Sequence, residues 1–362
     1  MQQLISYIAL GAPATRRPAT GKLPFLRPEF GFTPKWYNEV LGIDFGEKWH
    51  INPAYRKQSL AEMRIEIDNR FPGNQIGKHE NKTPDLLTGL FGACSIAAIY
   101  GVPIRFEADQ WPVSEHVFIS DEEMGNLQPP DLSVNPFFLK IMEQVDWIAR
   151  NEGKVYGFMN WQGVLNNAQR IRGQELFMDF YMNPGGVKNL LDCVSTTMIE
   201  AAKILQQKQH DSGIDFTFFT VSNCLVNMLS PELYNEFILP FDQKIAAEFE
   251  TIGIHNCAWS ATPYLADYAK VPKVAYIDMG MDSDLETAKL LFRETRRAIM
   301  YTPMDLANKT KEQIRNDMEL IAEKYGPCDI VAADIEFGTP DEKVRELVTI
   351  CHQISEKYND KN

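Results

Sequence analysis

The sequence predicts an α/β protein built as a single closed (β/α)8 barrel, preceded by an irregular and partly helical extension. Strand-like and helix-like segments alternate with short connections after about residue 84, which favours parallel strands joined by crossover helices. Eight strand-like segments can be counted, and 362 residues with 44% hydrophobic content are enough for one large barrel core. No Gly-x-Gly-x-x-Gly follows these segments, which disfavours the alternative, a doubly wound nucleotide-binding sheet. We assign residues 1–75 to the extension and residues 76–362 to the barrel, within one structural domain overall.

The first two thirds of the chain contain the less regular elements. Residues 23–71 are rich in aromatic residues, Pro and Gly, and residues 23–26 are a candidate first strand. Runs of β-branched and aromatic residues predict further strands, and apolar residues three and four positions apart predict helices. We expect strands at residues 104–107, 155–159, 216–220 and 252–259, and helices at residues 86–97, 137–148, 187–207 and 231–249.

The C-terminal third shows the clearest alternation. Strands are expected at residues 274–278, 298–301 and 330–333. Each is followed by a capping box, in which a hydroxyl side chain and a Glu or Gln three positions later satisfy each other's backbone donors. The pairs are Ser283 with Glu286, Thr310 with Gln313, and Thr339 with Glu342, with Pro340 at the first position of the last helix.

Charge and cysteine usage narrow the compartment and the partners. The net charge of −13 argues against binding to nucleic acid or to anionic membrane surfaces, because both require a basic face. No run of about 18 apolar residues is present, and residues 1–24 lack the pattern of a signal peptide. The six cysteines include no Cys-x-x-Cys pair, which suits free thiols. We therefore expect a cytoplasmic protein that binds neither nucleic acid nor membranes.

The segment from residue 252 to 259 carries the most informative chemical pattern. His255 and Cys257 are two residues apart, so on an extended backbone their side chains leave the same face. An imidazole and a thiol that converge at a strand end form half of a zinc site. The alternative is that the pair occurs by chance and that Cys257 is a small hydrophobic residue of the core.

In a barrel of this kind, the chemistry lies at the C-terminal ends of the strands. Glu107 and Asp109 form a carboxylate pair suited to acid–base work, and with Asn223 they are our candidate catalytic residues. Side chains past other strand ends offer an apolar wall and polar groups that orient a small molecule. The candidate substrate-binding residues are Trp111, Asn160, Trp161, Gln162, Trp259, Asp278 and Met279. The alternatives are a hydrated loop for the carboxylate pair and simple packing under loops for the others.

Several stretches of the chain carry a family resemblance. They are residues 230–240, residues 338–344, residues 158–184 with Gly-Gln-Glu-Leu at 173–176, and residues 101–104 together with Trp111-Pro112. These stretches resemble the uroporphyrinogen decarboxylase superfamily, and the likeness covers most of the chain after about residue 84. The resemblance implies a single TIM barrel, in agreement with the strand count.

The superfamily contains metal-free decarboxylases of porphyrinogens and zinc-dependent methyltransferases that work with a corrinoid protein. The methyltransferase branch carries His-x-Cys after the fifth strand, matched here by His255 and Cys257. It usually adds a Cys near the end of the eighth strand, where this chain has none, and Cys328 lies at the start of that strand. Asp334 and Glu336 lie near the expected position, so we expect one of these carboxylates to be the third zinc ligand.

The resemblance thus implies a zinc-dependent methyltransferase that uses a corrinoid protein and a small methyl donor or acceptor. A carboxylate ligand would make the zinc more Lewis acidic, which favours activation of a methylated compound over methylation of a thiol. The decarboxylase branch fits less well, because its Arg-rich N-terminal segment is reduced here to Arg27 beside an acid, Glu29. The alternatives are a lyase acting on a tetrapyrrole or small carboxylic acid, and a catalytically silent barrel subunit. The oligomeric state, a homodimer included, stays open.

Overall fold

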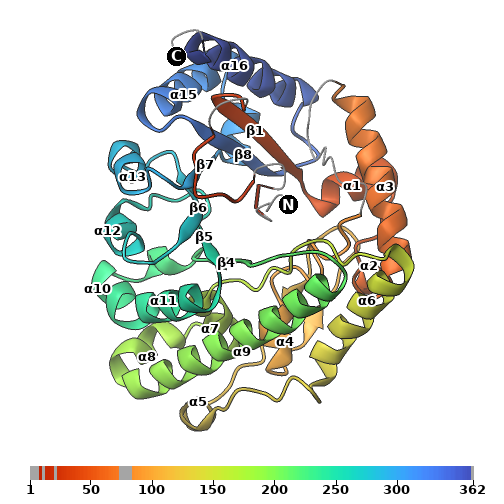
Figure 1. Cartoon of the computed structure of the whole chain (residues 1–362), viewed down its shortest axis with the longest axis vertical. Coiled ribbons are helices and arrows are strands. Elements are labelled where there is room, and N and C mark those ends of the chain that lie inside the picture. The colour runs from red at the N-terminus through yellow and green to blue at the C-terminus, as the bar shows by residue number, and fades with distance from the viewer. Residues whose placement is uncertain (1–7, 10–12, 20–22, 73–83, 360–362) are drawn as a thin grey trace.

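Six parallel strands form one hydrogen-bonded sheet that makes up most of a barrel wall. The computed structural model describes residues 8–9, 13–19, 23–72 and 84–359. The strand order β1-β8-β7-β6-β5-β4 places the first strand beside the last, as barrel closure requires. Figure 1 shows the helices arranged around these strands. The strands are β1 Leu26–Phe32, β4 Phe218–Ser222, β5 Thr251–His255, β6 Val274–Gly280, β7 Arg296–Met300 and β8 Cys328–Ile335.

Two of the eight expected strands differ from the prediction. Residues 104–107 contribute only β2 (Ile104–Arg105), which pairs antiparallel with β3 (Val113–Ser114) in a separate hairpin. Residues 155–159 are not assigned to any strand of the described sheet. Tyr156 and Phe158 nevertheless pack in the same buried cluster as side chains of β4 and β6, so this segment lines the barrel without strand pairing. The α/β barrel is confirmed, with six paired strands in place of eight.

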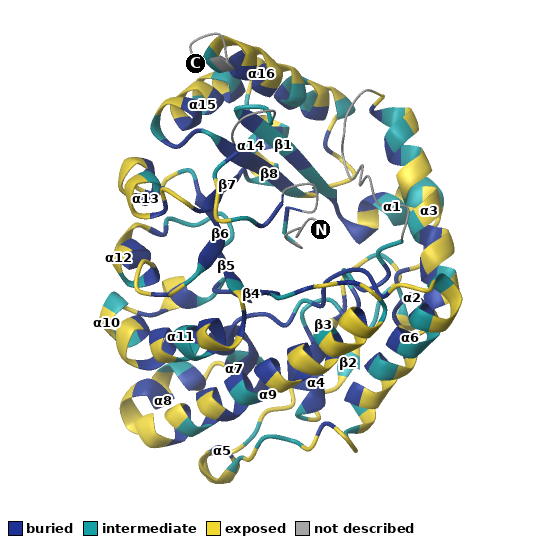
Figure 2. Cartoon of the chain, viewed as in Figure 1, coloured by how far each residue is buried: buried dark blue, intermediate teal, exposed yellow. Residues whose placement is uncertain are grey.

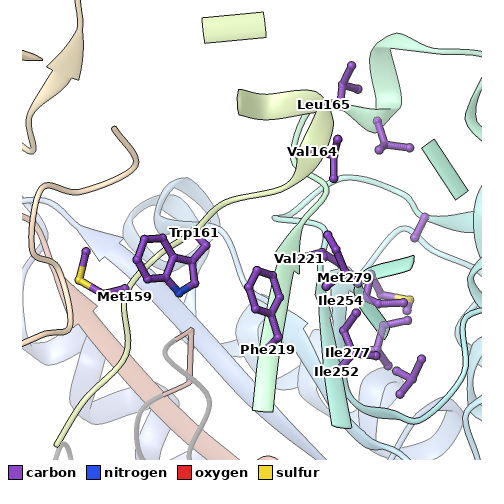
Figure 3. Close-up of a cluster of buried hydrophobic side chains, with 14 of the residues drawn as sticks. Met159, Trp161, Val164, Leu165, Phe219, Val221, Ile252, Ile254, Ile277 and Met279 are labelled. Atoms are coloured by element: carbon purple, nitrogen blue, oxygen red, sulfur yellow. The ribbon is translucent and has the colours of Figure 1, made fainter. Parts of the chain in front are cut away.

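Alternate residues of each strand face opposite sides of the sheet. Phe218 of β4, Tyr276 of β6 and Met300 of β7 belong to a buried cluster inside the barrel. The intervening residues pack in the layer between the sheet and the helices. Figure 3 shows part of this layer, with Phe219 and Val221 on β4, Ile252 and Ile254 on β5, and Ile277 and Met279 on β6. Burial of both faces explains why these strands have nearly continuous apolar sequences.

Helices cover the outer face of the sheet, and Figure 2 shows buried residues along their inward faces and exposed residues outside. The helices expected at residues 137–148 and 187–207 are confirmed as α6 and α9, although both are longer than predicted. The helices after the hairpin are α5 Asp121–Asn126, α6 Pro136–Glu152, α7 Val164–Arg172, α8 Leu176–Met182, α9 Pro184–Asp211, α11 Leu239–Glu248, α12 Leu265–Tyr268, α13 Leu285–Leu291, α14 Pro303–Asn308, α15 Lys311–Lys324 and α16 Asp341–Asn359.

Two expected helices are interrupted. Residues 86–93 form turns, and only α4 (Ser95–Ile99) is helical, because Gly89 and Gly92 have φ angles of +87° and +54° that an α-helix excludes. The helix expected at residues 231–249 is divided into α10 (Pro231–Leu233), a π-helical turn η2 (Tyr234–Ile238) and α11. Pro240 lacks the N–H that a regular helix would use at this point, which accounts for the wider turn.

The helix caps follow the prediction in part. Thr310 and Gln313 form the expected capping box at the start of α15. At α13 the cap is Asp284, whose side chain accepts a hydrogen bond from the Thr287 N–H at 3.1 Å. Ser283 instead accepts one from the Ala261 N–H at 3.0 Å, which ties two loops together. The last helix begins at Asp341, so Pro340 lies one residue before it.

Part of the N-terminal region forms the helical extension, and part of it belongs to the wall of the barrel. Helices α1 (Pro34–Leu41), α2 (Glu47–Ile51) and α3 (Pro53–Arg70) form the expected helical extension. Strand β1, however, pairs with β8 from Leu26 opposite Cys328 onward, so residues assigned to the extension complete the sheet. None of the helices in the described part of the chain combines the length and apolar composition needed to cross a membrane.

Candidate metal centre

The ends of β4 and β5 bring three metal-binding side chains together. Parallel pairing places Ser222 beside His255, the last residue of each strand. Two residues later on each chain segment come Cys224 and Cys257, which therefore lie side by side. The ligand atoms of Cys224, His255 and Cys257 all lie within 4.8 Å of one another. We call these three residues the Cys-His-Cys group.

The distances within the Cys-His-Cys group are short and non-covalent. The two Sγ atoms are 3.0 Å apart, and Sγ of Cys257 is 3.2 Å from Nε2 of His255. Both cysteines are free thiols. Zinc binds thiolate sulfur at about 2.3 Å and imidazole nitrogen at about 2.0–2.1 Å, so a small outward shift of the side chains would place all three around one ion.

Asp278, on β6, fixes the orientation of His255. Its carboxylate oxygens lie 2.7 and 2.9 Å from Nδ1 of His255, so Nδ1–H donates to Asp278 and Nε2 faces the thiols. Carboxylates hold metal-bound histidines in this way. Burial opposes protonation of His255, but the negative charges of Asp278 and the two cysteines outweigh it and raise the pKa of His255 well above its usual range. The pocket therefore favours a positive charge at this point.

The contact between the two thiols shifts their pKa values in opposite directions. The hydrogen bond from Cys257, aided by the charge of His255, lowers the pKa of Cys224 to about 4 against the effect of burial. The same hydrogen bond, with burial, raises the pKa of Cys257. Cys224 is therefore the cysteine that forms a thiolate more readily. A thiolate is the form of cysteine that binds metal ions.

Unusual backbone geometry holds the loop that carries Cys257. Cys257 has a φ of +56°, a conformation that costs a non-glycine residue on the order of 1–3 kcal/mol. The loop is pressed against the end of β6, where a Cβ on Gly280 would lie 2.1 Å from the carbonyl oxygen of Ala258. A glycine is therefore required at position 280 for the loop to reach the metal centre.

Buried hydrogen bonds hold the ends of β4 and β5 in place. Asn223 donates its backbone N–H to the carbonyl of His255 at 2.7 Å and its amide to Asp242 at 2.9 Å. Asn256 likewise receives a hydrogen bond from Tyr268 at 2.6 Å and donates to the backbone of β6 at 2.8 Å. Asn223 is fully buried and positions the loops through these hydrogen bonds. Its expected catalytic role stays a prediction.

The structure joins His255 and Cys257 as expected, but the third member of the group differs from the prediction. Neither Asp334 nor Glu336 belongs to the Cys-His-Cys group. Asp334 lies across the barrel mouth, where loss of hydration and the charge of Glu336 raise its pKa and the charge of His255 acts in the opposite direction. Ligation by either carboxylate, as a further ligand beside the three, stays a prediction.

Sequence reasoning missed Cys224, although the chain contains a signal for it. The tripeptide Ser-Asn-Cys at residues 222–224 follows β4, and His-Asn-Cys at residues 255–257 follows the neighbouring strand β5. Two x-Asn-Cys motifs after adjacent parallel strands place two thiols at the same height of the barrel. The repeated Asn also has a repeated role, because both amides anchor the loops to buried partners.

The candidate residues before residue 112 are not members of the Cys-His-Cys group. Glu107 and Asp109 are on the loop between β2 and β3, where Glu107 contacts Arg105 and Gln110. This arrangement supports the alternative of a hydrated loop. Trp111 packs edge-on against Trp49 with ring centroids 5.9 Å apart, as part of the N-terminal cover.

The other predicted substrate-binding residues either pack against hydrophobic neighbours or hold the loops of the metal centre. Met279 and Trp161 are buried and belong to the hydrophobic cluster drawn in Figure 3. Trp161 also lines a small cavity beside Phe158 and Phe218. Asp278 orients His255 and is fully buried, so it is a positioning residue. Trp259 packs edge-on against Tyr264 and follows Cys257 by two residues.

The amides form a chain of hydrogen bonds that ends beside Cys224. Asn160 accepts from the Gln162 side chain at 3.0 Å, and Gln162 accepts from Asn166 at 2.8 Å. Asn166 in turn accepts from the N–H of Leu225 at 3.2 Å. Asn160 and Gln162 are thus connected to the metal centre through the first turn of α7.

Comparisons with known proteins identify the family of this chain. A family model described as uroporphyrinogen decarboxylase (URO-D) matches residues 74–354. A solved methyltransferase from Methanosarcina mazei is 17% identical with a TM-score of 0.65, covering 97% of this chain and 99% of that chain, and it shares the fold. A B12-independent methionine synthase from Shewanella sp. W3-18-1, in complex with selenomethionine, is 10% identical with a TM-score of 0.47, covering 93% and 98%. No curated protein matches the chain. Because the family model spans well over half of its length, the chain belongs to the uroporphyrinogen decarboxylase family.

Proposed function

We propose that the protein is a zinc-dependent methyltransferase that moves a methyl group between a small compound and a corrinoid carried by a partner protein. The observation that carries the proposal is the Cys-His-Cys group at the C-terminal ends of β4 and β5, with its histidine held by Asp278. The fold shared with a protein described as a methyltransferase adds support at the level of architecture.

The donor set of the Cys-His-Cys group suits zinc. Two thiols and an imidazole are preferred zinc ligands, and three protein ligands leave a fourth position for a substrate atom. When bound there, zinc would lower the pKa of a substrate thiol or polarise a methyl donor. The residues of the chain supply the rest: Asp278 keeps Nε2 of His255 aimed at the ion, and the loop at Gly280 keeps Cys257 beside Cys224.

A second sulfur ligand changes the expected substrate. The sequence alone pointed to a carboxylate ligand and hence to a harder, more Lewis acidic ion. Cys224 makes the site softer, which favours a sulfur atom in the open position. We therefore propose that the small substrate is a thiol or its methyl thioether, and that the corrinoid partner gives or takes the methyl group.

A lyase is the second candidate, and the family match is the observation that favours it. A substrate with several carboxylates requires free basic side chains. Arg27, the remaining arginine of the N-terminal segment, forms an ion pair with Glu29 at 2.9 Å and is therefore not free for such a substrate. This contact makes decarboxylation of a porphyrinogen the weaker proposal.

Methyl transfer to cobalt tests the proposal. Zinc-loaded protein is mixed with reduced cobalamin and a panel of methyl thioethers, N-methylated and methoxylated compounds, and the spectrum of methylcobalamin is followed. We expect methylation only with enzyme and a donor present, loss in Cys224→Ser and Cys257→Ser, and retention in Cys193→Ser, a thiol on α9 outside the group.

The other outcomes separate the alternatives. No methylation with any donor, together with decarboxylation of a porphyrinogen or a small acid, establishes the lyase. A protein that binds zinc but catalyses neither reaction is a silent subunit.

A further inference from the structure

Tyr234 is a fully buried tyrosine whose hydroxyl group is connected to the loop of Cys224 by two hydrogen bonds. Its OH donates to Oδ2 of Asp242 at 2.8 Å, and the side-chain amide of Asn223 donates to the same oxygen atom at 2.9 Å. Asn223 directly precedes Cys224 and also donates its backbone N–H to the carbonyl oxygen of His255 at 2.7 Å. The carboxylate oxygen that Tyr234 holds therefore fixes the amide next to Cys224.

The π-helical turn η2 explains how Tyr234 reaches Asp242. Asp242 follows Tyr234 by eight positions, and in a regular α-helix of about 3.6 residues per turn their directions would differ by about 80° around the axis. In η2 the N–H of Leu239 bonds to the carbonyl oxygen of Tyr234, five positions earlier, so this turn accommodates one extra residue. Residues 234 and 242 then correspond to positions seven apart in a regular helix, whose directions differ by only about 20°. The wide turn thus brings the hydroxyl group and the carboxylate to the same face.

The aromatic ring of Tyr234 is connected to the loop of Cys257. It packs edge-on against the ring of Tyr268, with centroids 5.3 Å apart and an interplanar angle of 84°. The OH of Tyr268 donates to Oδ1 of Asn256 at 2.6 Å, and Asn256 lies between His255 and Cys257 in the chain. Tyr268 is also fully buried, and in a close-packed interior neither ring moves without displacing its neighbours. The supports of the two cysteine loops therefore meet at Tyr234.

We infer that Tyr234 is a positioning residue of the metal centre, which fixes the separation of Cys224 and Cys257 through its hydroxyl group on one side and its ring on the other. This inference rests on the zinc centre of the proposed function. Residues that hold the ligands of a metal site set its affinity, and their replacement lowers metal affinity about 10- to 100-fold. Tyr234 acts through Asp242 and Asn223, one step further from the ligands, so we expect the lower end of this range.

The test uses Tyr234→Phe, which keeps the ring and removes only the hydroxyl group. The matched control is Tyr301→Phe, because the buried Tyr301 donates the same kind of hydrogen bond to Asp317, at 2.7 Å, outside both cysteine loops. We expect the zinc affinity, measured by competition with a chromophoric chelator, to fall about tenfold in Tyr234→Phe and to stay unchanged in Tyr301→Phe. The thiolate-to-cobalt charge-transfer absorption of the cobalt(II)-substituted protein should weaken or shift in Tyr234→Phe alone. Tyr268→Phe, which removes the hydrogen bond to Asn256, carries the same test if Tyr234→Phe does not fold.

Other results overturn the inference in distinguishable ways. If Tyr234→Phe keeps the zinc affinity and the cobalt spectrum of the parent protein, and only its thermal stability falls as in Tyr301→Phe, Tyr234 stabilises the fold and does not position the centre. An equal loss of zinc affinity in both variants also contradicts the inference, because it reflects stability alone. A zinc affinity that depends on Tyr234 in a protein that transfers no methyl group supports the inference while the proposed reaction fails. A parent protein that binds neither zinc nor cobalt contradicts both.

Discussion

Asp278 determines which nitrogen of His255 faces the two thiols. Replacing its carboxylate by an amide in Asp278→Asn removes the charge that holds Nδ1–H, and the imidazole is then free to turn or to change tautomer. We expect zinc affinity to fall about 10- to 100-fold, the range observed when partners of metal-bound histidines are replaced. Competition with a chromophoric chelator measures this change.

The matched control is Asp282→Asn, an exposed aspartate four residues further along the chain. Its zinc affinity should equal that of the parent protein. An unchanged affinity in Asp278→Asn would show that His255 is oriented by something other than the carboxylate.

We expect Asp242, on α11, to make the free energy of unfolding of the protein depend on pH. It is fully buried, and burial raises its pKa from 3.8 to about 6 despite hydrogen bonds from Asn223 and Tyr234. Because the folded-state pKa is raised, the stability contribution of this group is full below pH 3.8 and is lost as the pH rises through about 6. Relative to Asp242→Asn, the free energy of unfolding of the parent protein should therefore fall by on the order of 3 kcal/mol across this interval.

Urea unfolding of both proteins at a series of pH values checks the prediction. Above about pH 7 the difference should be constant, since Asp242 is ionised in both the folded and the unfolded chain. A difference that does not change between pH 4 and 7 would mean that Asp242 titrates normally. Asp282→Asn is again the control, because the side chain of Asp282 is exposed.

At the level of single residues, the sequence identified two of the three members of the Cys-His-Cys group. His255 and Cys257 could be predicted because both lie on one short segment whose spacing is visible in the sequence. Cys224 could not be predicted from spacing along the chain, since its proximity to Cys257 depends on the pairing of β4 with β5. The roles of Asn223 and Asp278 depend on burial and hydrogen bonding, which the residue type alone does not determine.

The loop after β5 lies close to Gly280 at the end of β6. We therefore expect a methyl group added at this position to displace the loop. In Gly280→Ala, the new Cβ would lie 2.1 Å from the carbonyl oxygen of Ala258. The loop carrying Cys257 must then move, so we expect loss of zinc binding and a destabilisation of about 1–3 kcal/mol from overpacking. Zinc content and thermal unfolding report the two effects.

Gly125→Ala is the matched control, because a Cβ at Gly125 in α5 meets open space. This variant should bind zinc normally. Normal zinc binding in Gly280→Ala would show that the loop reaches the metal centre without the close approach.

At the scale of elements, the buried parallel strands were the most predictable part of the fold. Strands β5 to β8 are rich in apolar residues because both of their faces are covered. The helix expected at residues 86–97 was wrong because apolar spacing alone does not reveal that Gly89 and Gly92 adopt left-handed conformations. The hairpin of β2 and β3 was also missed, since its two-residue strands carry too little periodicity.

At the scale of the whole molecule, the first strand completes the sheet formed by the end of the chain. Strand β1 pairs with β8, and Ser355 of α16 accepts from the N–H of Leu26 at 2.9 Å and donates to its carbonyl at 3.2 Å. A fragment of residues 76–362 would expose the edge of β8. We therefore expect this fragment to be unstable, although the sequence alone suggested a boundary near residue 75.

Circular dichroism and urea unfolding of the fragment and the full chain check this expectation. The full chain should unfold in one cooperative transition at a higher urea concentration. A fragment with the same spectrum and the same transition would show that residues 1–75 are a dispensable cover.

In the proposed metal centre, Cys224, His255 and Cys257 together bind one zinc ion. X-ray absorption at the zinc edge of the purified, zinc-loaded protein tests it most directly, because it identifies the ligand atoms. We expect one zinc per chain with two sulfur ligands at about 2.3 Å and one imidazole nitrogen at about 2.0–2.1 Å, and a loss of one sulfur in Cys224→Ser. A protein that stays free of zinc, or a zinc ion surrounded only by oxygen and nitrogen, would contradict it.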